Sequence, residues 1–342
     1  MLLTLLLVGA GAAFARIQYL PLAMDGDYGT YRDAAAHIAE GAPVTHDVAL
    51  RMLKPLPLLV IAALAPAIGY ESATLVQAVL FYFALIVAMF LLAHEFLKNR
   101  ELAAYATLLV MLSYPVLKYG LELLTETGGL FFYIISLWLA LCFVATPTWK
   151  LLLWNAVVVT VGFFWKEYAI VSAVIFGLAI LFHAALSWRA KAYFVAAYGA
   201  IFLGAHVPWQ MYVDAVYQYS YQSWFSEGGA VGYASEYTLK NIVKSTAALL
   251  GIAWLLVPLG ARSFGRLHAV QRRFLALAML PPLVSFAWGY ITSRLLYVLA
   301  PQFVLLAVEG MRPWRREAQI AAVGVTILGN VLWLFMSYSI TL

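Results

Sequence analysis

The sequence predicts an all-α integral membrane protein with about eleven transmembrane helices, each of roughly 20 apolar residues. Two observations support this prediction. Of the 342 residues, 65% are hydrophobic and only 11% are charged, whereas a soluble domain carries roughly 25% charged residues. The mean hydropathy is +0.88, and apolar stretches follow one another from end to end. This composition excludes a sizeable separate soluble domain, so we expect a single polytopic domain over residues 1–342.

The predicted spans are taken in order along the chain. They lie near 2–22, 73–94, 102–119, 127–146, 150–165, 168–187, 192–209, 243–260, 274–290, 295–311 and 318–338. The first begins MLLTLLLVGAGAAFA and ends in small residues, as a signal peptide does, but no lysine or arginine precedes its apolar core. We therefore expect a retained span rather than a cleaved leader. Cys142 is the only cysteine, which excludes an intrachain disulfide and a cysteine metal cluster.

The segment KPLPLLVIAALAPAIG (54–69) is apolar but short, and it contains three prolines. A segment of this length is typical of an interfacial or re-entrant helix. We expect a juxtamembrane surface helix within a first extracytoplasmic loop, 23–72. The alternative is a twelfth span, which would place that loop in the cytoplasm.

With the surface helix, the basic residues of the later loops fall on one side, which the positive-inside rule makes cytoplasmic. They are Lys98, Arg100, Lys150, Arg189, Lys191, Arg262, Arg266, Arg272, Arg273, Arg312, Arg315 and Arg316. With the twelfth span, the basic residues of the first loop would join this side. Charge counting alone therefore leaves both topologies open.

Four polar clusters then gather at the extracytoplasmic ends of helices. They are DGDYGTYRD (25–33), ELLTET (122–127), WKE (165–167) and YITSR (290–294). Charges at the edge of the hydrocarbon are costly unless they face a wet cavity or a partner. The sequence thus predicts one shared cavity, although each cluster alone could be an ordinary solvated helix end.

Each cluster carries a chemical option and a structural alternative. Asp25 and Asp27 form a D-x-D pair, which can hold a divalent cation or supply a general base with a positioning carboxylate. DGD is also a plain turn sequence. A third acid, Glu126, could simply complete a helix N-terminus after Thr125.

The basic members of the clusters suit an anionic ligand. Arginine binds phosphate through two parallel hydrogen bonds, which makes Arg294 a phosphate-binding candidate. Lys166 is adjacent to Glu167, so the two side chains are expected to point to different faces of a helix. The alternatives are an interfacial anchor for the arginine and snorkelling for the lysine.

Aromatic residues fill a long predicted extracytoplasmic loop, 210–242. They are Tyr212, Tyr217, Tyr219, Tyr221, Trp224, Phe225, Tyr233 and Tyr237. Such a loop is consistent with an aromatic belt at the membrane interface, or with a lid that faces a sugar or a lipid.

Taken in order, these segments resemble the GT-C fold glycosyltransferases, in particular the polyprenyl-phosphate-mannose-dependent mannosyltransferases. DGDYGTYRDAAAHIAEGAP resembles their first outer loop, and KPLPLLVIAALAPAIGYES resembles the surface helix that follows it. LTETGGLFFYIISLWLAL, FFWKEYAIVSAVIFGLAIL and SRLLYVLAPQFVLLAVEGM are similar to three later segments. The family pattern in the first loop falls on Asp27, Tyr31, Ala34, Ala35, Gly41 and Pro43.

The resemblance implies a transferase that moves a sugar, with inversion, from a polyprenyl-phosphate donor to an acceptor hydroxyl of a glycan, lipid or protein. It implies a multi-pass protein of the cell's inner (plasma) membrane, with the active site on the extracytoplasmic face. Asp27 would be the base, supported by Asp25. The donor phosphate would bind Arg294 and Lys166, with Arg16 as a weaker third candidate.

Substrate positioning would fall to Glu126, Glu167, Tyr31 and Tyr290. This chemistry needs no nucleotide and no acid catalyst, because the lipid phosphate leaves as an anion. A divalent cation remains an option if Asp25 and Asp27 hold one. No nucleic acid partner is expected, because the net charge of +5 lies in the loops between spans. The alternative function is a transporter or flippase for a lipid-linked sugar or another amphiphile, which should show internal repeats and interrupted helices.

Overall fold

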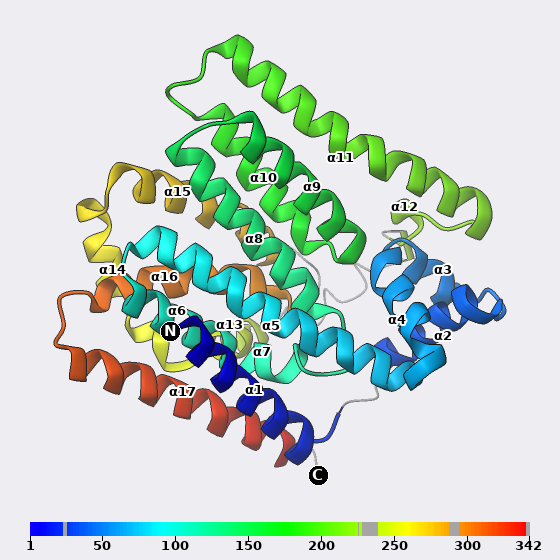
Figure 1. The fold of residues 1–342 in the computed structure, drawn as a ribbon, viewed down its shortest axis with the longest axis horizontal. Helices are drawn as coiled ribbons and strands as arrows, with labels where there is room; N and C mark the ends of the chain where they lie inside the picture. Colours follow the sequence, from blue (N-terminus) through cyan, green and yellow to red (C-terminus); the bar gives the residue numbers. More distant parts are fainter. Residues whose placement is uncertain (23–25, 225, 228–238, 287–293, 340–342) are drawn as a thin grey trace.

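The computed structural model of the chain describes residues 1–22, 26–224, 226, 227, 239–286 and 294–339 (Figure 1). Every regular element within these ranges is a helix. The α-helices are α1 (Leu2–Tyr19), α2 (Gly26–Glu40), α3 (His46–Met52), α4 (Pro55–Ile68), α5 (Tyr70–Leu97), α6 (Arg100–Met111), α7 (Tyr114–Tyr119), α8 (Glu126–Ala145), α9 (Trp149–Trp165), α10 (Tyr168–Leu181), α11 (Trp188–Tyr217), α12 (Tyr221–Trp224), α13 (Leu239–Leu250), α14 (Val257–Ser263), α15 (Ala269–Met279), α16 (Ala300–Met311) and α17 (Arg316–Ser339). Short 3-10 helices are η3 (Gly251–Leu255), η4 (Phe264–Arg266), η5 (Pro281–Phe286) and η6 (Leu295–Leu299).

Among the described residues, five helices are long and apolar enough to cross a membrane: α1, α5, α8, α11 and α17. Two bent helix pairs raise the number to as many as seven if each pair is one span. The helical architecture and these apolar helices support a membrane protein. The predicted count of eleven spans is not confirmed.

Breaks in the helices account for much of the difference. The predicted span 274–290 is interrupted because α15 ends at Met279 and a 3-10 helix begins at Pro281, where proline cannot continue an α-helix. The predicted span 102–119 is split between α6 and α7, and α7 has Pro115 in its first turn. Three further apolar helices, α9, α10 and Leu296–Met311, have only 10–17 residues.

The predicted surface helix corresponds to α4, which begins with Pro55 at its first position. It meets α3 at an angle of 109°, a geometry that fits either a broken span or a re-entrant loop. Both topologies considered for this segment therefore remain open. Together α2, α3 and α4 enclose a small second core that also includes the end of α11. Its members include Tyr31, Leu58, Ile61, Val213 and Tyr219.

The main core is centred on α5 and α8, which pack along each other and against α6, α10 and α16. Tyr82, Tyr133 and Phe143 are fully buried there. In contrast, only Phe194, Tyr198, His206 and Val213 are buried along the 30 residues of α11. Apolar helix surface that contacts no other part of the protein suits lipid.

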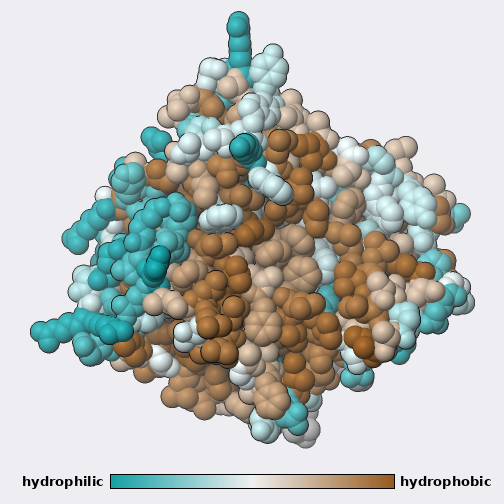
Figure 2. Space-filling view, viewed as in Figure 1, coloured by the Kyte–Doolittle hydropathy of each residue, from teal (hydrophilic) through white to brown (hydrophobic). Residues whose placement is uncertain are grey.

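The two ends of the helix bundle differ in charge. At one end, Arg312 Nη2 donates to the Leu97 carbonyl at 2.7 Å, so the basic loops at 98–100 and 312–316 meet. Figure 2 shows hydrophilic side chains gathered on the left, over α14 and the start of α17, and hydrophobic side chains across the middle. The opposite end holds α2, α3 and the start of α8 (Figure 1), where the candidate site lies.

Candidate functional site

The structure brings together four residues that the sequence singled out, from four separate segments of the chain. Arg294 links two carboxylates: its Nη1 donates to Asp27 Oδ2 at 2.6 Å, and its Nε donates to Glu126 Oε1. Lys166 Nζ donates to the same oxygen of Glu126 at 2.7 Å. The four side chains thus form one continuous ion-pair network, which we call the Asp27 network.

Arg51, from the last turn of α3, completes this network. Its Nη2 donates to Asp27 Oδ1, and its Nε donates to Thr30 Oγ1 at 2.7 Å. The guanidinium also lies over the ring of Tyr31, 4.2 Å from the ring centroid. Both carboxylate oxygens of Asp27 are therefore bound by arginine in this structure.

Local backbone geometry aims these side chains at one another. Asp27 lies in the first turn of α2, where the helix dipole favours a carboxylate. Lys166 has an extended backbone, φ −161° and ψ 148°, in the break between α9 and α10. The next residue, Glu167, directly precedes α10. The two residues therefore do not occupy different faces of one helix, contrary to the sequence prediction. They lie in a break between helices, where Lys166 pairs with Glu126 and Glu167 pairs with Lys54.

Two glycines let α8 approach this break. A Cβ atom built on Gly128 would lie 2.1 Å from Nε1 of Trp165, and one on Gly129 would lie 2.8 Å from Cβ of Lys166. The Trp165 ring can then donate its N–H to the carbonyl of Thr125 at 3.1 Å. Glycine at these positions is what allows Lys166 to reach Glu126.

Glu126 has an unused acceptor. The residue is completely buried, and its Oε2 has no hydrogen-bond partner among the described residues. Buried carboxylate oxygens are normally hydrogen-bonded. This oxygen is therefore suited to accept a hydrogen bond from a hydroxyl group of a ligand.

The network carries one net positive charge, because three cations (Arg51, Lys166 and Arg294) face two carboxylates. Burial favours a higher pKa for Asp27, but the charges of Arg51, Arg294 and Lys166 outweigh it and hold the pKa of Asp27 well below its ordinary value. The Asp27 side chain is still 29% exposed, and that of Arg294 is 24% exposed. A ligand from outside can reach both groups.

Of the two other predicted positioning residues that the structure describes, Tyr31 contacts the network and Glu167 does not. Tyr31 is completely buried, and its hydroxyl lies 3.0 Å from Oγ1 of Thr125, so it joins α2 to the start of α8. Glu167 pairs with Lys54 instead of joining the network. Asp25 and Tyr290 lie outside the described residues, as do positions 228–238 of the aromatic loop.

Arg16 lies in a second polar cluster, where it is 2% exposed. All five of its N–H groups are used, by the carbonyl oxygens of Leu20, Pro21 and Leu117, by Glu122 Oε1 and by the Tyr338 hydroxyl. A guanidinium has only five N–H donors. Binding a donor phosphate here would require breaking contacts that tie α1 to α7 and α17.

No group of three or more His, Cys, Asp or Glu side chains is arranged for a metal ion in the described part of the chain. Asp25, the other half of the predicted cation pair with Asp27, lies outside that part. In this structure each of the two carboxylate oxygens of Asp27 pairs with a guanidinium group, one from Arg51 and one from Arg294.

Sequence reasoning missed Arg51, Thr125 and Trp165 as members of the site. The available signals were weak: Arg51 shares the first predicted loop with Asp27, and the other two lie within the quoted polar clusters. No protein-family model matches the chain, and no curated protein is significantly similar to it. The fold and the Asp27 network are therefore the basis for a proposal of function.

Proposed function

We propose that this protein is a membrane glycosyltransferase that moves a sugar from a polyprenyl-phosphate donor to an acceptor hydroxyl, with inversion. The Asp27 network is the active site, on the extracytoplasmic face of the inner (plasma) membrane. One observation carries the proposal: a reachable carboxylate, Asp27, lies 2.6 Å from Arg294, within a network of net positive charge at the end of an apolar helix bundle. Inverting transfer from a lipid phosphate needs this combination of base and anion site.

The chemistry assigns one role to each group. Asp27 takes the proton from the acceptor hydroxyl while the oxygen of that hydroxyl attacks the anomeric carbon. The bond between that carbon and the phosphate oxygen breaks, and the polyprenyl phosphate leaves as an anion. Arg294 and Lys166 stabilise the charge that develops on the phosphate. The free oxygen of Glu126 accepts a hydroxyl of the sugar.

The proposal requires the contact between Asp27 and Arg294 to open when the donor binds. In an inverting displacement, the base and the leaving group stand on opposite sides of the anomeric carbon, so the sugar ring must separate the two side chains. The donor phosphate supplies Arg294 with a replacement anion. Asp27 then loses one of its two arginine partners and becomes a stronger base at the step that needs one.

The decisive test compares Asp27→Asn with the parent protein, using a polyprenyl-phosphate sugar as donor and measuring release of polyprenyl phosphate. General base catalysis contributes about 10²–10⁴-fold, so turnover should fall by that order while donor binding is retained. Asp33→Asn is the matched control, because Asp33 lies exposed on the same helix, paired with Arg32. Near-normal turnover by a well-folded Asp27→Asn protein would remove Asp27 as the base.

A chelator arm tests the metal option separately. If Asp25 and Asp27 hold a required cation, the chelator should abolish turnover by the parent protein, and Asp25→Asn and Asp27→Asn should fail together. If Asp27 acts alone as the base, turnover should survive the chelator and Asp25→Asn should be the milder change.

A transporter or flippase is the second candidate, and the two bent helix pairs favour it. These pairs bend by 109° and 61°, and interrupted helices are common at transporter binding sites. Reconstituted vesicles separate the two functions. A transporter moves the intact lipid-linked sugar between leaflets, whereas the transferase releases polyprenyl phosphate only when an acceptor is present.

A further inference from the structure

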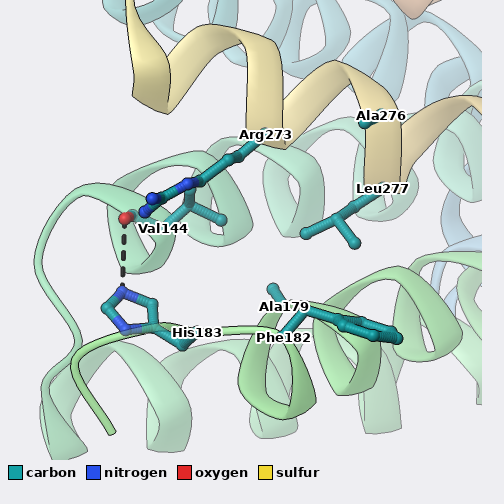
Figure 3. Close-up of a pocket in the computed structure, with 7 residues that line it drawn as sticks. All are labelled: Val144, Ala179, Phe182, His183, Arg273, Ala276 and Leu277. Atoms are coloured by element: carbon teal, nitrogen blue, oxygen red, sulfur yellow. Dashed lines mark hydrogen bonds between the residues drawn. The ribbon is translucent and has the colours of Figure 1, made fainter.

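A cavity of about 260 Å³ lies between α8, α10 and α15, away from the Asp27 network (Figure 3). Its lining is almost entirely apolar. The lining residues are Val144, Ala179, Phe182, His183, Arg273, Ala276 and Leu277. Figure 3 shows the Arg273 side chain extending along the cavity toward the end where His183 lies. We call this cavity the α15 pocket.

The α15 pocket and the Asp27 network lie at opposite ends of α8. Glu126 begins this helix of 20 residues and Val144 lies in its last turn, so the two sites are about 27 Å apart along the axis at 1.5 Å per residue. The hydrocarbon core of a bilayer is about 30 Å thick. If α8 spans the membrane, the pocket opens toward the leaflet opposite the one that adjoins the Asp27 network.

His183 contributes no charge to the pocket. Its Nδ1 accepts from the Ala185 N–H at 3.3 Å, so the ring proton is on Nε2, which donates to the Val144 carbonyl at 3.3 Å. Burial, together with the charges of Arg273 and Lys191, lowers the pKa of this histidine. The ring is therefore neutral, and both of its nitrogens are used within the protein.

Arg273 supplies the positive charge at the pocket. Its residue is exposed, and it forms no ion pair with a carboxylate among the described residues. Lys191 lies near enough to act on the same histidine. An apolar cavity with an unpaired guanidinium at its edge is complementary to a molecule that has an alkyl chain and an anionic head.

We propose that the α15 pocket binds an anionic phospholipid, with part of an acyl chain in the cavity and the phosphate on Arg273. A cationic pocket at a bilayer surface selects anionic head groups over zwitterionic ones. The opposite charge of the head group and the apolar lining together distinguish this occupant from a soluble phosphate and from a neutral lipid. The inference does not depend on the proposed transferase activity.

Native mass spectrometry of the purified full-length protein tests the proposal with phosphatidylglycerol and phosphatidylcholine of identical acyl chains. The parent protein should retain phosphatidylglycerol preferentially. Loss of a hydrogen bond to a charged group weakens binding about tenfold or more. Arg273→Gln should therefore weaken binding of phosphatidylglycerol by that factor and abolish the preference for it over phosphatidylcholine. Arg272→Gln is the matched control, because it changes the neighbouring exposed arginine, which does not line the pocket.

A second variant tests the cavity itself. Ala276→Trp places an indole at a lining residue that is exposed, and it should weaken binding of phosphatidylglycerol. Ala184→Trp adds the same side chain at an exposed residue outside the lining and should leave binding unchanged. Inorganic phosphate and glycerol phosphate should not compete at concentrations similar to that of the lipid. Equal retention of the two lipids by the parent protein, or unchanged phosphatidylglycerol binding by Arg273→Gln, would overturn the proposal.

Discussion

At the scale of single residues, the environment of Asp27 sets what this carboxylate can do. Arg51 and Arg294 each bind one of its oxygens, so it stays ionised but is a weak base while both pairs persist. Arg51 has a structural role, because it also donates to Thr30 and lies over the ring of Tyr31. Arg294 is the partner that a donor phosphate can take.

Arg51→Gln should lower thermal stability at neutral pH, by about 1.5–3 kcal/mol for a lost hydrogen bond between charged groups. The folded pKa of Asp27 is lowered in the parent protein, so its contribution to stability is present above the unfolded pKa and is lost as pH falls. The difference between Arg51→Gln and the parent should therefore shrink below about pH 4. Unfolding temperatures measured from pH 7 down to pH 3 check this.

Arg32→Gln is the control for that series, since Arg32 pairs with Asp33 at a position where both side chains are 51% exposed. Exposed pairs contribute little to stability, so this variant should follow the parent at every pH. If the fall in unfolding temperature of Arg51→Gln were the same at every pH, the packing of Arg51 on Tyr31, and not the charge of Asp27, would account for the effect.

Arg294→Ala should weaken binding of the donor, and Arg294→Lys should restore it only in part, because a lysine cannot bind two oxygens in the planar geometry of a guanidinium. Binding of a non-transferable polyprenyl phosphate to the purified variants provides the measurement. Arg312→Ala serves as a control, because Arg312 pairs with Glu309 at the other end of the bundle. Unchanged affinity in Arg294→Ala would exclude this residue from the phosphate site.

At the scale of helices, close contact between α8 and the break after α9 holds the network in place. The ring of Trp165 lies where a side chain on Gly128 would have to be. Trp165 directly precedes Lys166 and donates to the Thr125 carbonyl, so a change in helix spacing moves the lysine away from Glu126. The geometry of the ion pairs thus depends on a packing contact that carries no charge.

Gly128→Ala should destabilise the protein and reduce turnover together, because the added methyl group overlaps Trp165 and must displace it. Overpacking of this kind typically costs about 1–3 kcal/mol. Gly177→Ala, on α10, is the matched control, since a Cβ there has no atom within 4 Å and alanine favours the helix. Thermal unfolding and turnover are measured on both variants. A Gly128→Ala protein as stable as Gly177→Ala would contradict the contact.

At the scale of the whole molecule, the Asp27 network and the basic loops lie at opposite ends of the helix bundle. The Asp27 network lies at the end that holds α2 and α3, and the basic loops meet at the other end. Under the proposed function, the basic end is the cytoplasmic end, as the positive-inside rule predicts. The proposed donor would enter at the opposite face.

Single cysteines in a Cys142→Ser background test this orientation. Ala39→Cys, on the exposed face of α2, should react with a membrane-impermeant maleimide added to intact cells. Arg189→Cys, which is exposed at the start of α11, should react only after permeabilisation. The reverse pattern would place the Asp27 network in the cytoplasm and would exclude an extracytoplasmic active site.

From the sequence alone, the all-helical class could be predicted, because a stretch of about 20 apolar residues satisfies its own backbone hydrogen bonds in a bilayer when it is helical. It also singled out Asp27, Glu126, Lys166 and Arg294, because charges at helix ends are conspicuous among apolar residues. Proline positions marked α4 as unusual without deciding between a surface helix and a span.

Which charges pair with which depends on how the helices pack in three dimensions. Sequence reasoning offered Arg294 and, as a weaker candidate, Arg16 for the donor phosphate. Arg16 has all five donors used inside the protein, whereas Arg294 joins Asp27 to Glu126. Likewise, Arg51 lies 24 positions from Asp27 in the chain and joins the network because α3 packs against α2. Ion pairs between residues more than 20 positions apart depend on how helices pack, and no local pattern in the sequence encodes that packing.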